Sequence, residues 1–153
     1  MKIVAKKNGG FTLAELVMVV ALIAVLSAMA LPVAKFTVKR QKEAELRLAL
    51  RQIRTAIDEY KRMSDQGLIP LTIGGEGYPE ELNDLVEGVE VVGQETKMRF
   101  LRRIPVDPMT HDEWVLRSYQ DDVDSSSWGG ENVYDVRTSS EGTALDGTKY
   151  ADW

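Results

Sequence analysis

The chain has 153 residues, a formal net charge of −5 and no cysteine. The lack of cysteine excludes disulfides, thiolate metal sites and cysteine nucleophiles. The net negative charge disfavours nucleic-acid binding, and no basic stretch is interleaved with aromatic residues.

The N-terminal part changes abruptly from basic to apolar. Residues 1–10 carry Lys2, Lys6 and Lys7 and no acid, whereas residues 11–34 contain one ionisable side chain, Glu15. As an α-helix rising about 1.5 Å per residue, residues 11–34 would extend roughly 36 Å, enough to cross a membrane. The leader lysines predict a cytoplasmic N-terminus.

Glu15 is costly in such a segment, because a carboxylate at mid-membrane costs roughly 2.5–3.5 kcal/mol. Its place near the start of the apolar run lessens this cost, so it either reaches toward the lipid headgroups or pairs with a cation. An alternative for the whole segment is an ordinary secretory signal, cleaved after small residues such as Ala28, Ala30 and Ala34.

The helical pattern continues beyond the apolar run, with Pro32 expected to bend or locally unwind the helix. Residues 35–63 are amphipathic, with apolar positions spaced by three and four: Leu46, Leu50, Ile53, Ile57 and Tyr60. The sequence therefore predicts one long helix over residues 11–63. The basic residues just after the apolar run oppose the positive-inside rule in this topology; they are Lys35, Lys39, Arg40 and Lys42.

Residues 64–153 are predicted to form a small α+β region. Tyr78-Pro79 begins a short helix that ends near Glu87, and strands are expected at 114–119 and 132–138. Residues 139–153 should form an ordered loop. His111 lies alone in a polar turn and no serine has a nucleophile-elbow pattern, so an enzyme is not expected.

The N-terminal residues resemble the leader of type IV pilins and type II secretion pseudopilins. The resemblance rests on the basic leader, the Gly10-Phe11 bond, and Thr12, Leu13 and Glu15 before the apolar run. It implies that a prepilin peptidase cuts after Gly10 and methylates the new amine on Phe11. It also implies that this amine meets Glu15 of a neighbouring subunit, where an incoming copy with an unpaired carboxylate would be penalised.

Later segments are similar to the major pseudopilin family of type II secretion. They are Tyr78-Pro79, residues 104–108 and residues 133–136. This family typically binds calcium in an acidic C-terminal loop, which here implies Glu141, Asp146 and Asp152 as ligands, with Ser139 and Thr143 as carbonyl donors. The alternative is a solvated acidic tail, since Glu141 replaces the usual aspartate.

The resemblance implies a pilin-like α+β fold, with a leader at 1–10, a transmembrane and assembly helix at 11–34, its amphipathic continuation at 35–63 and a periplasmic region at 64–153. The expected function is a structural subunit of a periplasmic pseudopilus, anchored by a single pass in a bacterial inner membrane. Implied partners are further copies of the chain, the prepilin peptidase, a membrane platform with a cytoplasmic ATPase, and minor pseudopilins. The alternatives are a type IV pilus subunit, or a membrane-anchored periplasmic binding protein or enzyme.

Overall fold

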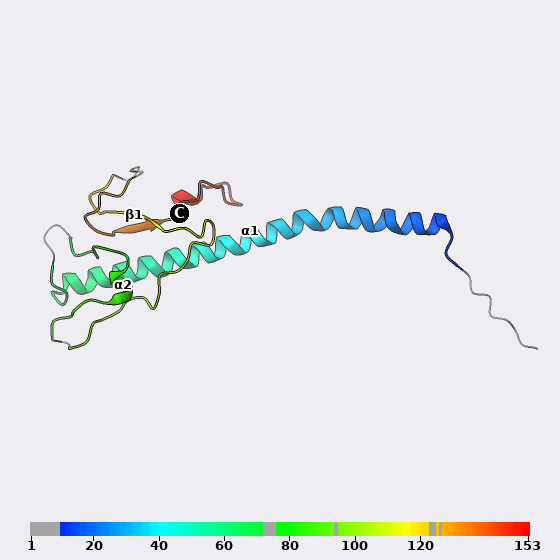
Figure 1. The fold of residues 1–153 in the computed structure, drawn as a ribbon. Helices are drawn as coiled ribbons and strands as arrows, with labels where there is room; N and C mark the ends of the chain where they lie inside the picture. The colour runs from blue at the N-terminus through cyan, green and yellow to red at the C-terminus, as the bar shows by residue number, and fades with distance from the viewer. Residues whose placement is uncertain (1–9, 72–75, 94, 123–124, 126) are drawn as a thin grey trace, which may run out of the picture. The chain divides into compact units, whose positions relative to one another are not determined.

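The computed structural model describes residues 10–71, 76–93, 95–122, 125 and 127–153. Its elements in chain order are helix α1 (Leu13–Asp65), helix α2 (Asp84–Glu87), strands β1 (Val115–Arg117) and β2 (Asp135–Arg137), and a 3-10 turn, η1 (Tyr150–Asp152). Figure 1 shows this order from the blue start of α1 to the red C-terminal segment. The predicted α+β class is confirmed.

The long N-terminal helix is also confirmed, and it is assigned without interruption through Pro32. The bend or unwinding expected at Pro32 stays a prediction. The chain divides into two compact units, Met1–Lys39 and Arg40–Trp153. Residues 1–9 of the predicted leader lie outside the described part of the chain.

The core of the second unit is built on the apolar face of α1. Leu46, Ile53 and Ile57 are almost completely buried, as the spacing of three and four residues predicts. They belong to one cluster with Leu85 of α2 and Val136 of β2. The C-terminal part of α1 is therefore the surface on which the smaller elements pack.

The two strands are antiparallel, with Leu116 opposite Val136 in the register. They are shorter than predicted because the flanking backbone bonds to side chains and loops instead. Asn132 is fully buried, and its Oδ1 accepts a hydrogen bond from the Tyr119 amide at 3.0 Å. The Tyr134 amide bonds to the Arg117 carbonyl at 2.9 Å, which continues the pairing beyond β2.

Helix α2 is also shorter than predicted, and its expected start at Pro79 is wrong. Asp84, the first helical residue, accepts a hydrogen bond from the Glu81 amide on its carboxylate at 2.9 Å. This bond satisfies the Glu81 amide in a turn, so the residues before Asp84 do not need the hydrogen bonds of a regular helix. Leu85 is fully buried, and its carbonyl accepts the amides of Phe100 and Leu101.

Asp107 fixes the turn that follows residues 104–106. Its buried carboxylate accepts the Met109 amide at 2.7 Å and the hydroxyl of Thr138, which follows β2 directly. A buried carboxylate requires such donors. Asp107 thus ties the loop before β1 to the end of β2.

Candidate functional site

The predicted cleavage bond precedes the helix. Gly10, Phe11 and Thr12 are not helical, and the Thr12 hydroxyl accepts the Glu15 amide at 3.2 Å, which makes Thr12 the cap of α1. Phe11 is 81% exposed, and a Cβ added at Gly10 would meet nothing within 4 Å. The Gly10–Phe11 bond can therefore enter a peptidase without unwinding α1.

Glu15 lies in the first turn of α1, where the partial positive charge of the helix N-terminus favours a carboxylate. Its side chain is exposed. In the described part of the chain its carboxylate makes no ion pair. Its neighbours on the helix, Leu16 and Val19, are apolar and exposed. Glu15 is a single charge on an otherwise apolar surface.

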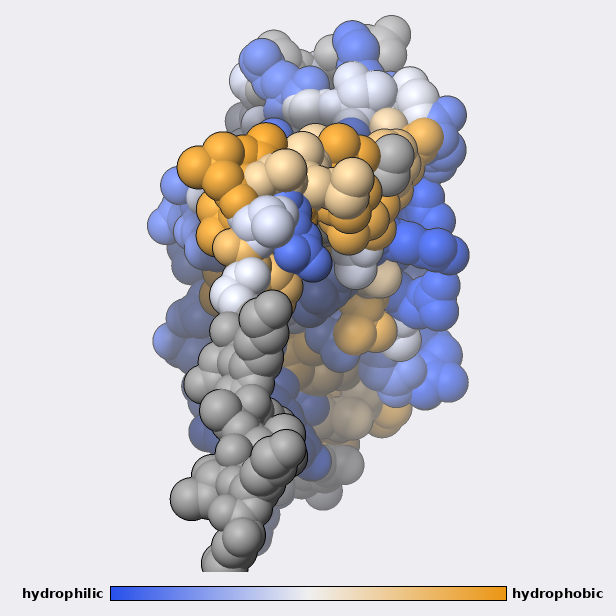
Figure 2. Space-filling model, turned by 90° about the vertical axis from the view of Figure 1, so that its right-hand side faces the viewer, coloured by the Kyte–Doolittle hydropathy of each residue, from blue (hydrophilic) through white to orange (hydrophobic). Residues whose placement is uncertain are grey.

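Apolar side chains are exposed on the N-terminal part of α1 from Leu13 to Leu26, and again at Val33 and Phe36. Figure 2 shows such side chains gathered on the surface of the molecule. An 18-residue window of this helix has a mean hydropathy of 2.7 and none of it is buried, so by length and composition it can cross a membrane. An apolar surface of this extent requires a lipid or protein environment.

One of the comparisons with known proteins gave a match, and it lies at the N-terminus. Residues 5–31 match the family model described as the prokaryotic N-terminal methylation motif. The chain carries a prepilin-type N-terminus. This motif implies processing by a prepilin peptidase and supports a pilin-like, structural role with membrane anchoring. Neither the curated proteins nor the solved structures gave a match.

Three of the five predicted calcium ligands are carboxylates, those of Glu141, Asp146 and Asp152, and the structure does not group them. Over the residues that the structure describes, no three acidic or histidine side chains are grouped so that they could hold a metal ion. The Asp146 carboxylate instead accepts the Thr148 hydroxyl at 2.6 Å and contacts Arg47 at 3.3 Å. Hydrogen bonds from Thr148, followed by the charge of Arg47, lower the pKa of Asp146. Calcium binding by Ser139, Glu141, Thr143, Asp146 and Asp152 stays a prediction.

The C-terminal segment is held to α1 by three charged side chains of that helix. Glu43 is buried, and its Oε1 accepts the Leu145 amide and the Tyr150 hydroxyl, each at 2.8 Å. Arg47 lies over the Trp153 ring, 4.1 Å from its centroid. Burial, and then the bond to Glu43, raise the pKa of Tyr150 to about 12.

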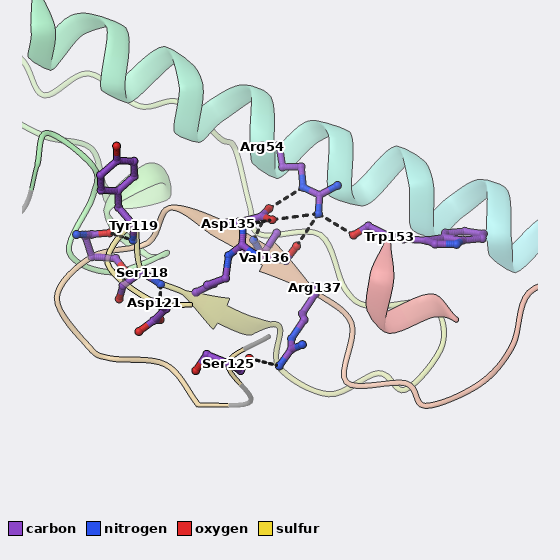
Figure 3. Close-up of polar contacts among 11 residues, drawn as sticks. Arg54, Ser118, Tyr119, Asp121, Ser125, Asp135, Val136, Arg137 and Trp153 are labelled. Atoms are coloured by element: carbon purple, nitrogen blue, oxygen red, sulfur yellow. Dashed lines mark hydrogen bonds and ion pairs between the residues drawn. The ribbon is translucent and has the colours of Figure 1, made fainter. Parts of the chain in front are cut away.

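Arg54 makes the third attachment, which Figure 3 shows. Its guanidinium donates to the Asp135 carboxylate at 2.7 Å and to the Trp153 carbonyl at 2.7 Å. It also donates to the Val136 carbonyl at 3.1 Å. One side chain thus joins α1, β2 and Trp153, the residue that follows η1.

The role of Glu43 was missed at the sequence level. Glu43 precedes Leu46 by three residues and therefore continues the apolar face of α1, where a charge is unexpected. A charged residue at this position of the apolar face was the signal in the sequence that Glu43 has a buried partner. Its partners, Leu145 and Tyr150, lie about 100 residues away, at separations of 102 and 107, so no local pattern identifies them.

Proposed function

We propose that this protein is a structural subunit of a type II secretion pseudopilus, cleaved at Gly10–Phe11 and polymerised through the N-terminal part of α1. The observation that carries the proposal is Glu15, a lone carboxylate on an apolar helix that follows an accessible Gly10–Phe11 bond. A simple membrane tether needs the apolar helix but neither the carboxylate nor the glycine. The matched methylation motif supports a pilin-like subunit processed by a prepilin peptidase.

Cleavage would give Glu15 its partner. The new amine on Phe11 is a cation, and the Glu15 carboxylate of a neighbouring copy would pair with it in an apolar surrounding. A charge pair there is favourable only when both members are present. A copy out of register leaves Glu15 unpaired, so the pair sets the axial position of each subunit.

The apolar helices would first be stored in the inner membrane, with residues 64–153 in the periplasm. Helices withdrawn from lipid would then pack against one another along the filament axis. The sequence contains no phosphate-binding loop of the Gly-x-x-x-x-Gly-Lys type, so the work of extraction must come from elsewhere. By resemblance, its source is a cytoplasmic ATPase acting through a membrane platform, and minor pseudopilins begin or cap the filament.

A type IV pilus subunit is the second candidate, because the methylation motif is shared by both kinds of filament. The lack of cysteine favours the pseudopilus, since many pilins close a C-terminal loop with a disulfide. The two assignments differ in phenotype. Deletion of a pseudopilus subunit blocks the export of periplasmic proteins, whereas deletion of a pilus subunit removes surface filaments and leaves that export intact.

The test of assembly is Glu15→Gln in cells that contain the prepilin peptidase and the assembly system. The variant should enter the membrane and be cleaved, yet form no filaments in sheared fractions or electron micrographs. Glu45→Gln is the matched control, because Glu45 is an exposed carboxylate on the same helix outside the apolar stretch. Normal filaments from Glu15→Gln would refute the pairing role.

A further inference from the structure

Three arginines line one hollow beside α1. The hollow has a volume of about 550 Å³ and is called here the arginine hollow. Its lining residues are Arg51, Gln52, Thr55, Phe100, Leu101, Arg102 and Arg103. Arg51 comes from α1, whereas Arg102 and Arg103 come from the loop before β1, so the fold brings together cations that are far apart in the sequence.

The cations of the arginine hollow have no acidic partner within the described residues. Arg51, Arg102 and Arg103 are all exposed and form no ion pair there. Arg47 and Arg54, on the same helix, are instead paired with Asp146 and Asp135. Like charges gathered without an anion repel one another, so the hollow is complementary to carboxylates or other anions.

The same chain offers an acidic counterpart. Residues 76–95 contain seven glutamates and aspartates and no lysine or arginine; the acids are Glu76, Glu80, Glu81, Asp84, Glu87, Glu90 and Glu95. Residues 80–90 are called here the acidic segment. Glu80, Glu81, Glu87 and Glu90 are exposed, and none of them forms an ion pair in the described part of the chain.

The two surfaces neighbour each other but are displaced along α1. The Leu85 carbonyl of the acidic segment accepts the amides of Phe100 and Leu101, and the Phe100 ring lies 5.4 Å from the Tyr60 ring, centroid to centroid, which places the acidic segment near Tyr60. Arg51 precedes Tyr60 by nine residues, or roughly 14 Å along the helix axis. Parallel copies shifted along this axis would bring the acidic segment of one toward the arginine hollow of the next.

We propose that the arginine hollow of one copy binds the carboxylates of the acidic segment of the next copy. This inference rests on the proposed function and names a contact between the soluble parts of adjacent subunits. The two surfaces differ, so the contact between copies is heterologous. When each copy is also shifted along the helix axis, the contact repeats from copy to copy without closing a ring and builds a filament. Guanidinium groups suit this role because they bind carboxylates through two parallel hydrogen bonds. A single exposed ion pair contributes little binding free energy, so several pairs are needed together. Their main effect is to fix the orientation of one copy relative to the next.

The test is a charge exchange in the full-length chain, with filaments measured in cells that contain the peptidase and assembly system. Arg102→Glu with Arg103→Glu should abolish filaments, and so should Glu80→Lys with Glu81→Lys. All four substitutions together should restore them. Lys97→Glu with Arg99→Glu is the matched control, because it makes the same charge change on exposed residues outside the hollow. Membrane insertion and leader cleavage should be unchanged in every variant.

Cross-linking distinguishes a direct contact from a general charge effect. The chain has no cysteine, so Arg103→Cys with Glu81→Cys introduces the only two thiols. Oxidation of assembled filaments should give a ladder of multimers, whereas either single cysteine should give none. Filaments that form normally with both arginines reversed, or that give no ladder, overturn this inference alone. A wild-type chain that forms no filaments overturns the proposed function as well. Loss of binding to anionic lipid vesicles with filaments intact would instead assign the hollow to phosphate headgroups.

Discussion

Replacing Glu43 should destabilise the second unit more than any other single carboxylate removal on α1. In Glu43→Ala the Leu145 amide and the Tyr150 hydroxyl both lose their acceptor. A hydrogen bond to a charged group contributes about 1.5–3 kcal/mol, so two such bonds give a loss of about 3 kcal/mol at the lower limit. Glu43→Gln keeps an acceptor oxygen but removes the charge and replaces the second oxygen with an amide NH2 group, which costs roughly 1 kcal/mol.

Thermal unfolding of the full chain in detergent, followed by near-UV circular dichroism, measures this difference. For a unit of this size, 1 kcal/mol lowers the midpoint by roughly 4 °C, so we expect about 12 °C for Glu43→Ala and about 4 °C for Glu43→Gln. Glu45→Ala is the control, since the described contact of the exposed Glu45 carboxylate is with Gln41 alone. Equal midpoints for Glu43→Ala and Glu45→Ala would refute the attachment of the C-terminal segment through Glu43.

Three further outcomes are expected. Gly10→Val should leave the leader attached, visible by mass spectrometry as a chain that begins before Phe11. The pKa of Tyr150 is raised to about 12 in the folded state, so the stability that its neutral form contributes is present below pH 10 and is lost as the pH rises toward about 12. In Tyr150→Phe, the free energy of unfolding should fall less over this pH range than in the wild type. Calcium binding by the C-terminal loop predicts that a chelator lowers the thermal midpoint of unfolding; an unchanged midpoint would remove the metal claim and leave Asp146 with its contacts to Thr148 and Arg47.

The sequence predicted what depends on local pattern. The apolar run before Ala34 and the spacing of Leu46, Ile53 and Ile57 indicated the long helix, because helical periodicity is visible over a few consecutive turns of sequence. The strands were also located, since Val115 and Val136 lie in short segments of strand-forming residues. Their exact ends depended on side-chain bonds such as that of Asn132, which no pattern reveals.

The arginines of α1 show where sequence reasoning stops. Arg47, Arg51 and Arg54 look alike on the polar face, and the sequence predicts only that they contact water or neighbouring subunits. In the fold, Arg47 and Arg54 bind the C-terminal segment, whereas Arg51 is joined by Arg102 and Arg103. The difference arises from long-range placement of the loops, which is set by the packed core and not by the helix itself.

This division of the arginines gives α1 two separate tasks in its second half. Arg47 and Arg54 hold the C-terminal segment, so their removal should lower stability. Those in the arginine hollow have no internal partner in the described residues, so their removal should spare stability and affect contacts between copies. Exposed, unpaired charges contribute little to folding. A variant such as Arg102→Glu with Arg103→Glu that keeps the wild-type unfolding midpoint but forms no filaments would therefore separate assembly from folding in a single comparison.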